Sequence, residues 1–178
     1  MKQCIVLLCG RTFSGKSTVA QQLAEGLPGM IISLDAINAE RGLWGGDGIP
    51  IEEWSRTMEL AHDRVGEAVG HGATVIIDDT SSPAFLRDRW RERAAALAVP
   101  LVLVYLKIDE AILRERLHRN RAEPSRGDVS DAVLTEHLAS FEPPTEAEAA
   151  LVVEESTEPA ALVAAVRDAL QAATERPR

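Results

Sequence analysis

The sequence predicts an α/β sandwich, in which a five-stranded, mostly parallel sheet lies between layers of helices. Short apolar runs alternate with amphipathic stretches along the chain, as in strands joined by crossover helices. The first run, Cys4–Cys9, is apolar at every position, which is typical of a strand buried on both faces of a parallel sheet. The 178 residues contain no internal repeat and no evident linker, so we expect one domain over residues 1–178.

Hydrophobic spacing and helix-ending residues define the other elements. Apolar positions from Val19 to Leu27 recur at helical spacing, and Pro28-Gly29 ends this helix. Four of the twelve glycines lie in Arg41–Pro50, which is expected to be a loop. The remaining strands are expected at Met30–Leu34, Ala73–Ile77, Leu101–Leu106 and Leu151–Val153, and the remaining helices at Ile51–Val69, after Pro83, from Asp109 to about Arg119, from Ser130 to about Phe141, and at Ala160–Ala173.

Several helix ends carry residues suited to capping. Gly72 is placed to end the second long helix. Ser82 and Pro83 are suited to the N-cap and first position of the next helix. Asp109 and Ser130 are expected to cap the two helices that follow.

Composition and charge exclude several classes of protein. Apolar residues make up 46% of the chain and charged residues 26%, as in a globular protein rather than a disordered one. The net charge of −9 argues against a protein that coats DNA or RNA, because such binding needs a basic surface. No apolar run approaches the roughly 20 residues of a membrane helix, and Ile5–Cys9 is too short for a signal-peptide core. Cys4 and Cys9 would lie ~16 Å apart on one strand, beyond disulfide reach, so we expect unpaired thiols in a cytoplasmic protein.

The segment Gly10–Ser17 reads GRTFSGKS and matches the P-loop pattern G-x-x-x-x-G-K-[ST] between a buried strand and a helix. Its glycines let backbone N–H groups point inward around a phosphate, and the helix starting near Gly15 adds the positive end of its dipole. We expect Lys16 to reach the β- and γ-phosphates and the Ser17 hydroxyl to bind Mg²⁺. The sequence therefore predicts a P-loop NTPase sandwich that binds a nucleoside triphosphate and Mg²⁺. The N-K-x-D guanine motif is absent, which argues against a GTPase; ATP is the expected cofactor, and GTP is the alternative. The expected nucleotide-binding residues are Gly10, Thr12, Phe13, Ser14, Gly15, Lys16, Ser17 and Thr18.

Acidic residues follow the second and third predicted strands. Asp35 ends the second strand at the sheet edge that carries the P-loop, where a carboxylate can accept the proton of an attacking hydroxyl. Its alternative role is a helix N-cap. Asp78 and Asp79 end the third strand with side chains on opposite sides, so one is expected to hold Mg²⁺ and the other to face the acceptor. We assign Asp78 to the metal and Asp79, with Thr80, to the substrate, although the sequence also allows the reverse assignment of the two aspartates. A helix cap or solvated loop end is the alternative for either.

Residues 110–126 hold five arginines and three glutamates, a net charge of +2 within a chain of −9. Arginine forks match phosphate oxygens, so we expect a short helical lid over residues 110–128. Helical spacing puts Arg116 and Arg119 nearly on one face, and both are expected to act in catalysis, with Arg121 binding the nucleotide. The alternative is a solvated helix with Glu–Arg pairs.

The acceptor pocket is expected between Asp35 and the third strand, lined by Arg41–Trp54. This segment holds two of the three tryptophans. Trp44 lies on the glycine-rich loop, where its ring can stack on a flat or sugar-like acceptor.

The P-loop, the SLD and IIDDT strand ends, and the RxxRNR run followed by FEPP resemble small P-loop kinases. These kinases are grouped around chloramphenicol phosphotransferase, the kinase domain of polynucleotide kinase and zeta-toxin-type sugar-nucleotide kinases. The resemblance covers about residues 3–145 and implies ATP-dependent transfer to a hydroxyl, with Asp35 as the base. Relatives that phosphorylate nucleic-acid 5′ ends carry an arginine three positions after the base. Here that position is Asn38, and Arg41 lies one helical turn further, so these two residues are expected to bind the substrate.

The expected activity is ATP-dependent transfer of a phosphoryl group to a hydroxyl of a small molecule. By analogy with relatives, the expected acceptor is an antibiotic or a nucleoside. Two alternatives stay open, namely a kinase of nucleic-acid 5′ ends and a nucleotide-binding regulatory ATPase without an acceptor. The missing arginine and the acidic net charge argue against nucleic acid.

Overall fold

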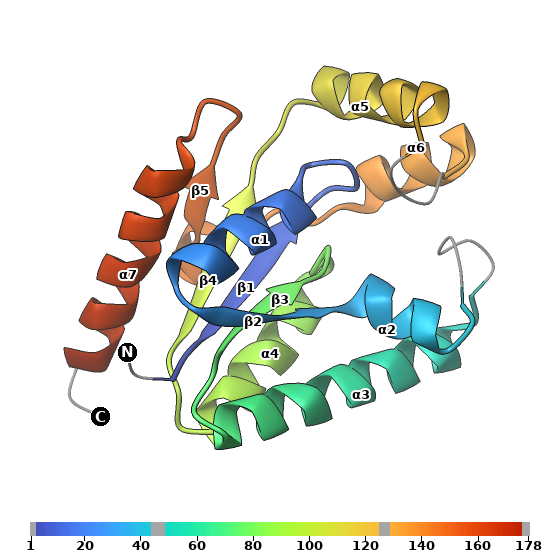
Figure 1. The fold of residues 1–178 in the computed structure, drawn as a ribbon. Helices are drawn as coiled ribbons and strands as arrows, with labels where there is room; N and C mark the ends of the chain where they lie inside the picture. The colour runs from blue at the N-terminus through green and yellow to red at the C-terminus, as the bar shows by residue number, and fades with distance from the viewer. Residues whose placement is uncertain (1–2, 44–48, 125–128, 176–178) are drawn as a thin grey trace.

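Five parallel strands form one sheet in the spatial order β2-β3-β1-β4-β5 (Figure 1). The computed structural model describes residues 3–43, 49–124 and 129–175. In chain order the elements are β1 (Ile5–Gly10), α1 (Lys16–Gly26), β2 (Gly29–Ser33), α2 (Leu34–Glu40), α3 (Ile51–Gly70), β3 (Thr74–Asp78), α4 (Ala84–Ala96), β4 (Leu101–Leu106), α5 (Glu110–Ala122), α6 (Asp131–Ser140), the 3₁₀ helix η1 (Glu146–Glu148), β5 (Leu151–Val153) and α7 (Pro159–Glu175). The α/β fold predicted from the sequence is confirmed.

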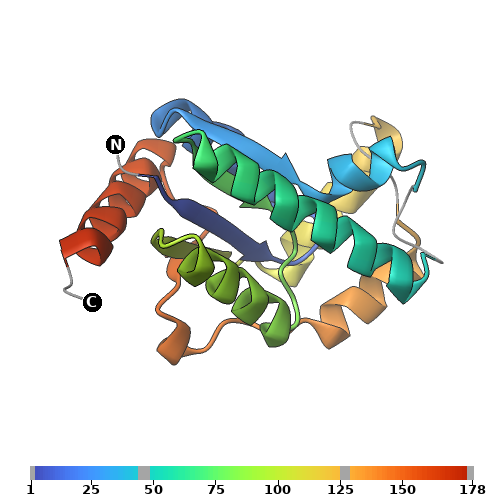
Figure 2. The ribbon, with the colours of Figure 1, turned by 90° about the horizontal axis from the view of Figure 1, so that it is seen from below.

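Helices cover both faces of the sheet (Figure 2). One apolar cluster joins the sheet to α3 and α4, and a second joins the opposite face to α1 and α7. The central strand β1 is buried along its whole length, as its continuous apolar run predicts. Cys4 and Cys9 are buried and unpaired, which confirms the prediction that they do not form a disulfide. No helix of the described residues is long and apolar enough to cross a membrane.

The second strand ends one residue earlier than predicted, because a short helix begins at Leu34. Ser33 is the N-cap of α2, and its Oγ accepts a hydrogen bond from the Ala36 N–H at 3.3 Å. Asp35 therefore lies in the first turn of a helix that the sequence analysis did not predict. The helix is too short for its apolar spacing to stand out from the strand before it.

The prediction for the start of α4 is wrong. Ser82 does not cap this helix: its Oγ accepts a hydrogen bond from the Glu142 N–H at 3.0 Å. The first N–H of α4, that of Ala84, instead donates to the Glu142 carboxylate at 2.8 Å. Glu142, which is distant in sequence, thus takes the place of Ser82 as the cap of α4. By contrast, Ser130 caps α6 as predicted, accepting a hydrogen bond from the Val133 N–H at 3.2 Å.

Candidate active site

The P-loop leaves the carboxyl end of β1 and enters α1 at Lys16 (Figure 1). Gly15 has a φ of 95°, a conformation that glycine adopts without steric cost. Gly10 is closely packed, since a Cβ there would lie 2.9 Å from the Ser14 Oγ and 3.2 Å from the Leu106 carbonyl oxygen. The loop conformation therefore favours glycine at position 15, and close packing disfavours a side chain at position 10.

The polar groups of the loop fit a bound phosphate chain. The Lys16 ammonium donates to the carbonyl oxygens of Gly10 and Arg11 at 3.1 and 3.0 Å, so it lies against the start of the loop. The buried Ser14 Oγ has no hydrogen-bond partner among the described residues. Ser17 and Thr18 are exposed in the first turn of α1. Backbone N–H groups at this helix start can bind phosphate oxygens.

A magnesium ion also fits the donors at this edge of the sheet. Mg²⁺ prefers oxygen ligands and is held by one or two protein groups together with phosphate oxygens and water. The exposed Ser17 hydroxyl, in the first turn of α1, and Asp78, at the end of β3, are two oxygen donors of the described residues that would hold it. The described residues contain no group of three or more His, Cys, Asp and Glu side chains placed to hold a metal.

The ends of β2 and β3 bring the acidic residues to one edge. Ser33 is the register partner of Asp78, and Asp35 follows Ser33 by two residues. Asp35 is exposed, and it does not cap α2 because Ser33 does. Ser33 rather than Asp35 is therefore the cap of α2, and Asp35 lies in the first turn of this helix.

Asp79 is the first residue of the β3–α4 connection. Its carboxylate accepts hydrogen bonds from the N–H and Oγ of Ser81 at 2.9 and 3.1 Å. Burial raises the pKa of Asp79 above its ordinary value, while these hydrogen bonds and the positive charge of Lys16 act in the opposite direction. The next residue, Thr80, accepts a hydrogen bond from the Gly10 N–H at 3.1 Å, which ties the end of β3 to the P-loop.

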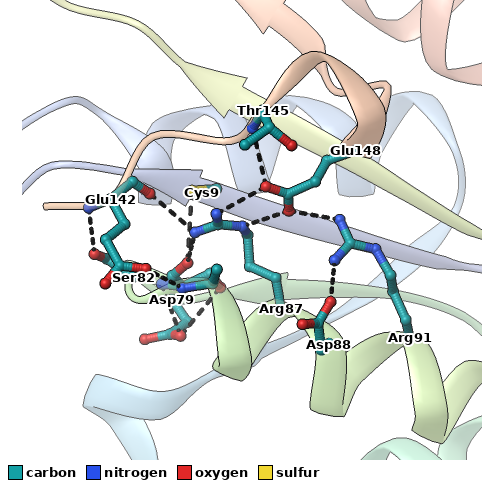
Figure 3. A network of polar contacts seen from close by, with 11 residues as sticks. Cys9, Asp79, Ser82, Arg87, Asp88, Arg91, Glu142, Thr145 and Glu148 are labelled. Carbon is teal, nitrogen blue, oxygen red and sulfur yellow. Dashed lines mark hydrogen bonds and ion pairs between the residues drawn. The ribbon is translucent and has the colours of Figure 1, made fainter.

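A buried arginine, which the sequence analysis missed, holds the β3–α4 connection in place (Figure 3). Arg87 is fully buried, and its Nη1 donates to the carbonyl oxygens of Ser81 and Glu142 at 2.9 and 3.0 Å. Its Nε and Nη2 bind the Glu148 carboxylate at 2.7 and 2.9 Å, and Arg91 binds the same carboxylate at 2.7 Å. Hydrogen bonds from Arg87 are the main cause that lowers the pKa of Glu148 to about 2. No local pattern marks these residues as partners, because Arg87 and Glu148 lie 61 positions apart.

The Cys9 thiol borders this network but has no reactive character. Its Sγ lies 3.7 Å from the Ser81 carbonyl oxygen. Burial raises the pKa of Cys9 to about 12, so the thiol stays protonated and acts as a small apolar side chain.

Of the three predicted lid arginines, Arg116 reaches the P-loop. Its Nη1 donates to the carbonyl oxygens of Phe13 and Ser14 at 3.2 and 2.9 Å, and its Nη2 lies 3.3 Å from Glu155. Arg119 is exposed and forms the i,i+4 pair with Glu115 that the sequence analysis held as the alternative. Arg121 binds Asp131 at 3.1 Å and the Val129 carbonyl oxygen at 2.8 Å, at the start of α6. Residues 125–128 of the predicted lid lie outside the described residues.

The predicted substrate residues Asn38 and Arg41 contact α3. Arg41 donates to the Glu53 carbonyl oxygen at 2.7 Å and to the Thr57 hydroxyl at 2.5 Å, and it also pairs with the Glu53 carboxylate. The Thr57 hydroxyl in turn donates to the buried Asn38 amide oxygen. These side chains fasten α2 to α3 in this conformation. Trp44 lies outside the described residues.

Two further contacts at the P-loop were not anticipated. The Nδ1 of His137, on α6, lies 3.4 Å from the Thr12 Oγ1. The Arg11 guanidinium lies over the Phe141 ring, 5.7 Å from its centroid. No role is expected from the sequence for any of the four histidines, because they show no metal-ligand spacing.

A P-loop at the carboxyl end of a central parallel strand, with acidic residues at the neighbouring strand ends, defines a P-loop nucleotide-binding α/β protein. The chain belongs to the AAA_33 family of AAA domains, whose family model matches residues 5–144. No curated protein matches the sequence.

Solved structures share the fold at low sequence identity. A gluconokinase from Sinorhizobium meliloti 1021 is 21% identical, with a TM-score of 0.67 over 96% of this chain and 91% of its own. The Mycobacterium tuberculosis APS kinase CysC, in complex with AMPPNP and APS, is 15% identical, with a TM-score of 0.71 over 96% and 98% of the two chains. Kti12 from Chaetomium thermophilum, in complex with ADP-AlF3, is 16% identical, with a TM-score of 0.74 over 95% and 98%. These similarities confirm a kinase-like P-loop fold; they do not confirm the narrower resemblance to the group around chloramphenicol phosphotransferase.

Proposed function

We propose that the protein is an ATP- and Mg²⁺-dependent kinase that transfers the γ-phosphoryl group to a hydroxyl of a small molecule. One observation carries the proposal: the P-loop, with Lys16, opens at the same sheet edge as the acidic ends of two neighbouring strands, where Ser33 pairs in register with Asp78. Phosphoryl transfer needs a group that positions the nucleophile and cations that offset the developing charge. At this sheet edge Asp35 would position the nucleophile, and Lys16 with Mg²⁺ would supply the cations.

The proposed roles follow from position. Bound ATP supplies the phosphoryl group, and Mg²⁺ offsets its charge. Asp35 accepts the proton of the attacking hydroxyl, since its exposed carboxylate lies at the start of α2 beside this edge. Lys16 binds the β- and γ-phosphates, and Arg116 holds the P-loop through two of its carbonyl oxygens. Asp79 and Thr80 border the acceptor side of the site.

The acceptor is proposed to be a small molecule. The gluconokinase and the APS kinase that share the fold are named for small-molecule substrates. The net charge of −9 argues against nucleic acid. Hydroxylated antibiotics and nucleosides, suggested by the sequence resemblance, and sugars or sugar acids, suggested by the structural neighbours, are the classes to screen.

The experiment is an ADP-release assay with Mg-ATP against a panel of these four classes. An acceptor that stimulates ADP release and gains phosphate by mass spectrometry supports the proposal. Asp35→Asn is expected to lower transfer by about 10²- to 10⁴-fold while nucleotide affinity stays near that of the wild type. Asp63→Asn, at an exposed aspartate on α3, is the matched control.

Three outcomes would contradict the proposal. Hydrolysis that no small molecule stimulates, but that a protein partner does, would identify a regulatory ATPase. Phosphorylation of a 5′-hydroxyl oligonucleotide, with binding that weakens steeply with salt, would identify a kinase of nucleic-acid ends. Unchanged transfer in Asp35→Asn would remove the base assignment.

A further inference from the structure

The helices α5 and α6 are docked directly on the P-loop. Phe13 has a φ of 65° and is 5% exposed, so its ring leaves the loop and enters an apolar cluster formed with these two helices. Its partners in the cluster are Leu113, Leu117, Leu134 and Leu138. Arg116 adds hydrogen bonds from α5 to the carbonyl oxygens of Phe13 and Ser14. The position of α6 relative to the loop is therefore set by packing.

This packing places a histidine beside the loop. His137 immediately precedes the buried Leu138, and its Nδ1 lies 3.4 Å from the Thr12 Oγ1. Thr12 is 8% exposed, whereas the His137 side chain is exposed. Within the described part of the chain, Nε2 of His137 has no hydrogen-bond partner. One ring nitrogen is held by the loop, and the other remains available to a ligand.

The end of the loop that His137 borders is the γ-phosphate end. The P-loop lysine reaches the β- and γ-phosphates, while N–H groups of the loop and the helix start hold the α- and β-phosphates. Here the Lys16 ammonium lies against the carbonyl oxygens of Gly10 and Arg11, next to Thr12. The terminal phosphate therefore belongs near residues 10–12, on the side where α6 presents His137.

We propose that His137 binds the γ-phosphate of the nucleoside triphosphate through Nε2, with Thr12 holding Nδ1. An imidazole N–H is a suitable donor to a phosphate oxygen, and hydrogen bonds to a charged group are stronger than neutral ones. The inference rests on the nucleotide site of the proposed function. It adds His137, which lies outside the P-loop and the arginine-rich helix α5, to the residues that bind the phosphates. It predicts that His137 distinguishes a triphosphate from a diphosphate.

The test compares the affinities of Mg-AMPPNP and Mg-ADP by isothermal titration calorimetry in three variants. His137→Asn places an amide near the position of Nδ1, so it can still bind Thr12 but does not reach the phosphate. His137→Gln places its amide near the position of Nε2. His137→Leu removes both groups. We expect Asn and Leu to weaken AMPPNP binding by about tenfold and ADP binding by less than about twofold, while Gln retains most of the preference.

The inference would be overturned if the variants ranked the other way in AMPPNP affinity. If His137 only fastens α6 to the loop, the Asn variant retains wild-type binding of both nucleotides, and the Leu and Gln variants bind AMPPNP and ADP more weakly by the same factor. An unchanged AMPPNP to ADP ratio in Leu also overturns it. His118→Gln, at an exposed histidine on α5, is the matched control. The titrations contain no acceptor, so failure of the kinase assay would not affect their result. Binding of ADP shows that each variant is folded.

Discussion

Glu148→Gln is expected to destabilise the fold more than a typical surface substitution. Glu148 accepts hydrogen bonds from Arg87 and Arg91 and from the Thr145 N–H at 2.9 Å (Figure 3). The substitution leaves the fully buried Arg87 without its counter-charge. Removing one partner of a buried ion pair costs about 3–5 kcal/mol. Arg91, the second arginine that binds Glu148, is partly exposed and stays solvated when the charge is removed, so we expect a loss of about 3 kcal/mol in the free energy of unfolding.

The pH dependence gives an independent measure of the same interaction. The pKa of Glu148 is lowered from an ordinary value of 4.5 to about 2, so its contribution is complete above pH 4.5 and is lost as pH falls toward 2. This difference corresponds to at most about 3 kcal/mol, and solvent around the partly exposed network lowers it to about 2 kcal/mol. The Gln variant is expected to lose this part of the acid dependence.

Urea unfolding followed by far-UV circular dichroism at several pH values measures both effects. A loss of about 3 kcal/mol in a chain of this size corresponds to a fall in Tm of roughly 6–12 °C. The control is Glu115→Gln, which removes an exposed i,i+4 partner of Arg119 and is expected to cost about 0.5 kcal/mol or less. A loss below about 1 kcal/mol in Glu148→Gln, with unchanged acid dependence, would refute the reasoning.

Two further predictions concern the α3–α4 interface and the P-loop. Burial, aided by the positive charges of Arg89 and Arg93, lowers the pKa of His62 from 6.5 to about 4, so the unfolded chain binds a proton that the fold excludes. The free energy of unfolding should therefore fall by about 1–2 kcal/mol more in the wild type than in His62→Phe as pH drops from 6.5 to 4, after allowance for solvent screening, and parallel profiles would contradict this. Gly10→Ala would bring a Cβ to 2.9 Å from the Ser14 Oγ and 3.2 Å from the Leu106 carbonyl oxygen, so we expect a loss of about 1–3 kcal/mol in stability and weaker AMPPNP binding. Gly70→Ala, where a Cβ meets nothing within 4 Å, is the control, and equal effects of the two substitutions would contradict the packing argument.

The elements that the sequence predicted well are those marked by a local signal. The continuous apolar run of β1 and the glycines of the P-loop lie within a few residues of the structure that they specify, so spacing alone located them. The helix α2 escaped prediction because its cap, Ser33, is itself the last residue of β2. The start of α4 was predicted wrongly because Ser82 bonds to a residue 60 positions away rather than to its own helix.

The sequence by itself determined the class of the protein: a parallel α/β fold with a P-loop, an aspartate just after the second strand and two at the end of the third. These features are local, since each depends on a short run of residue types. Only the tertiary structure decided the strand order, the buried Arg87–Glu148 pair, the attachment of Asn38 and Arg41 to α3, and the contact between His137 and Thr12. Most of these join residues far apart along the chain, 125 positions in the last case, and packing of helices on the sheet rather than residue spacing brings them together.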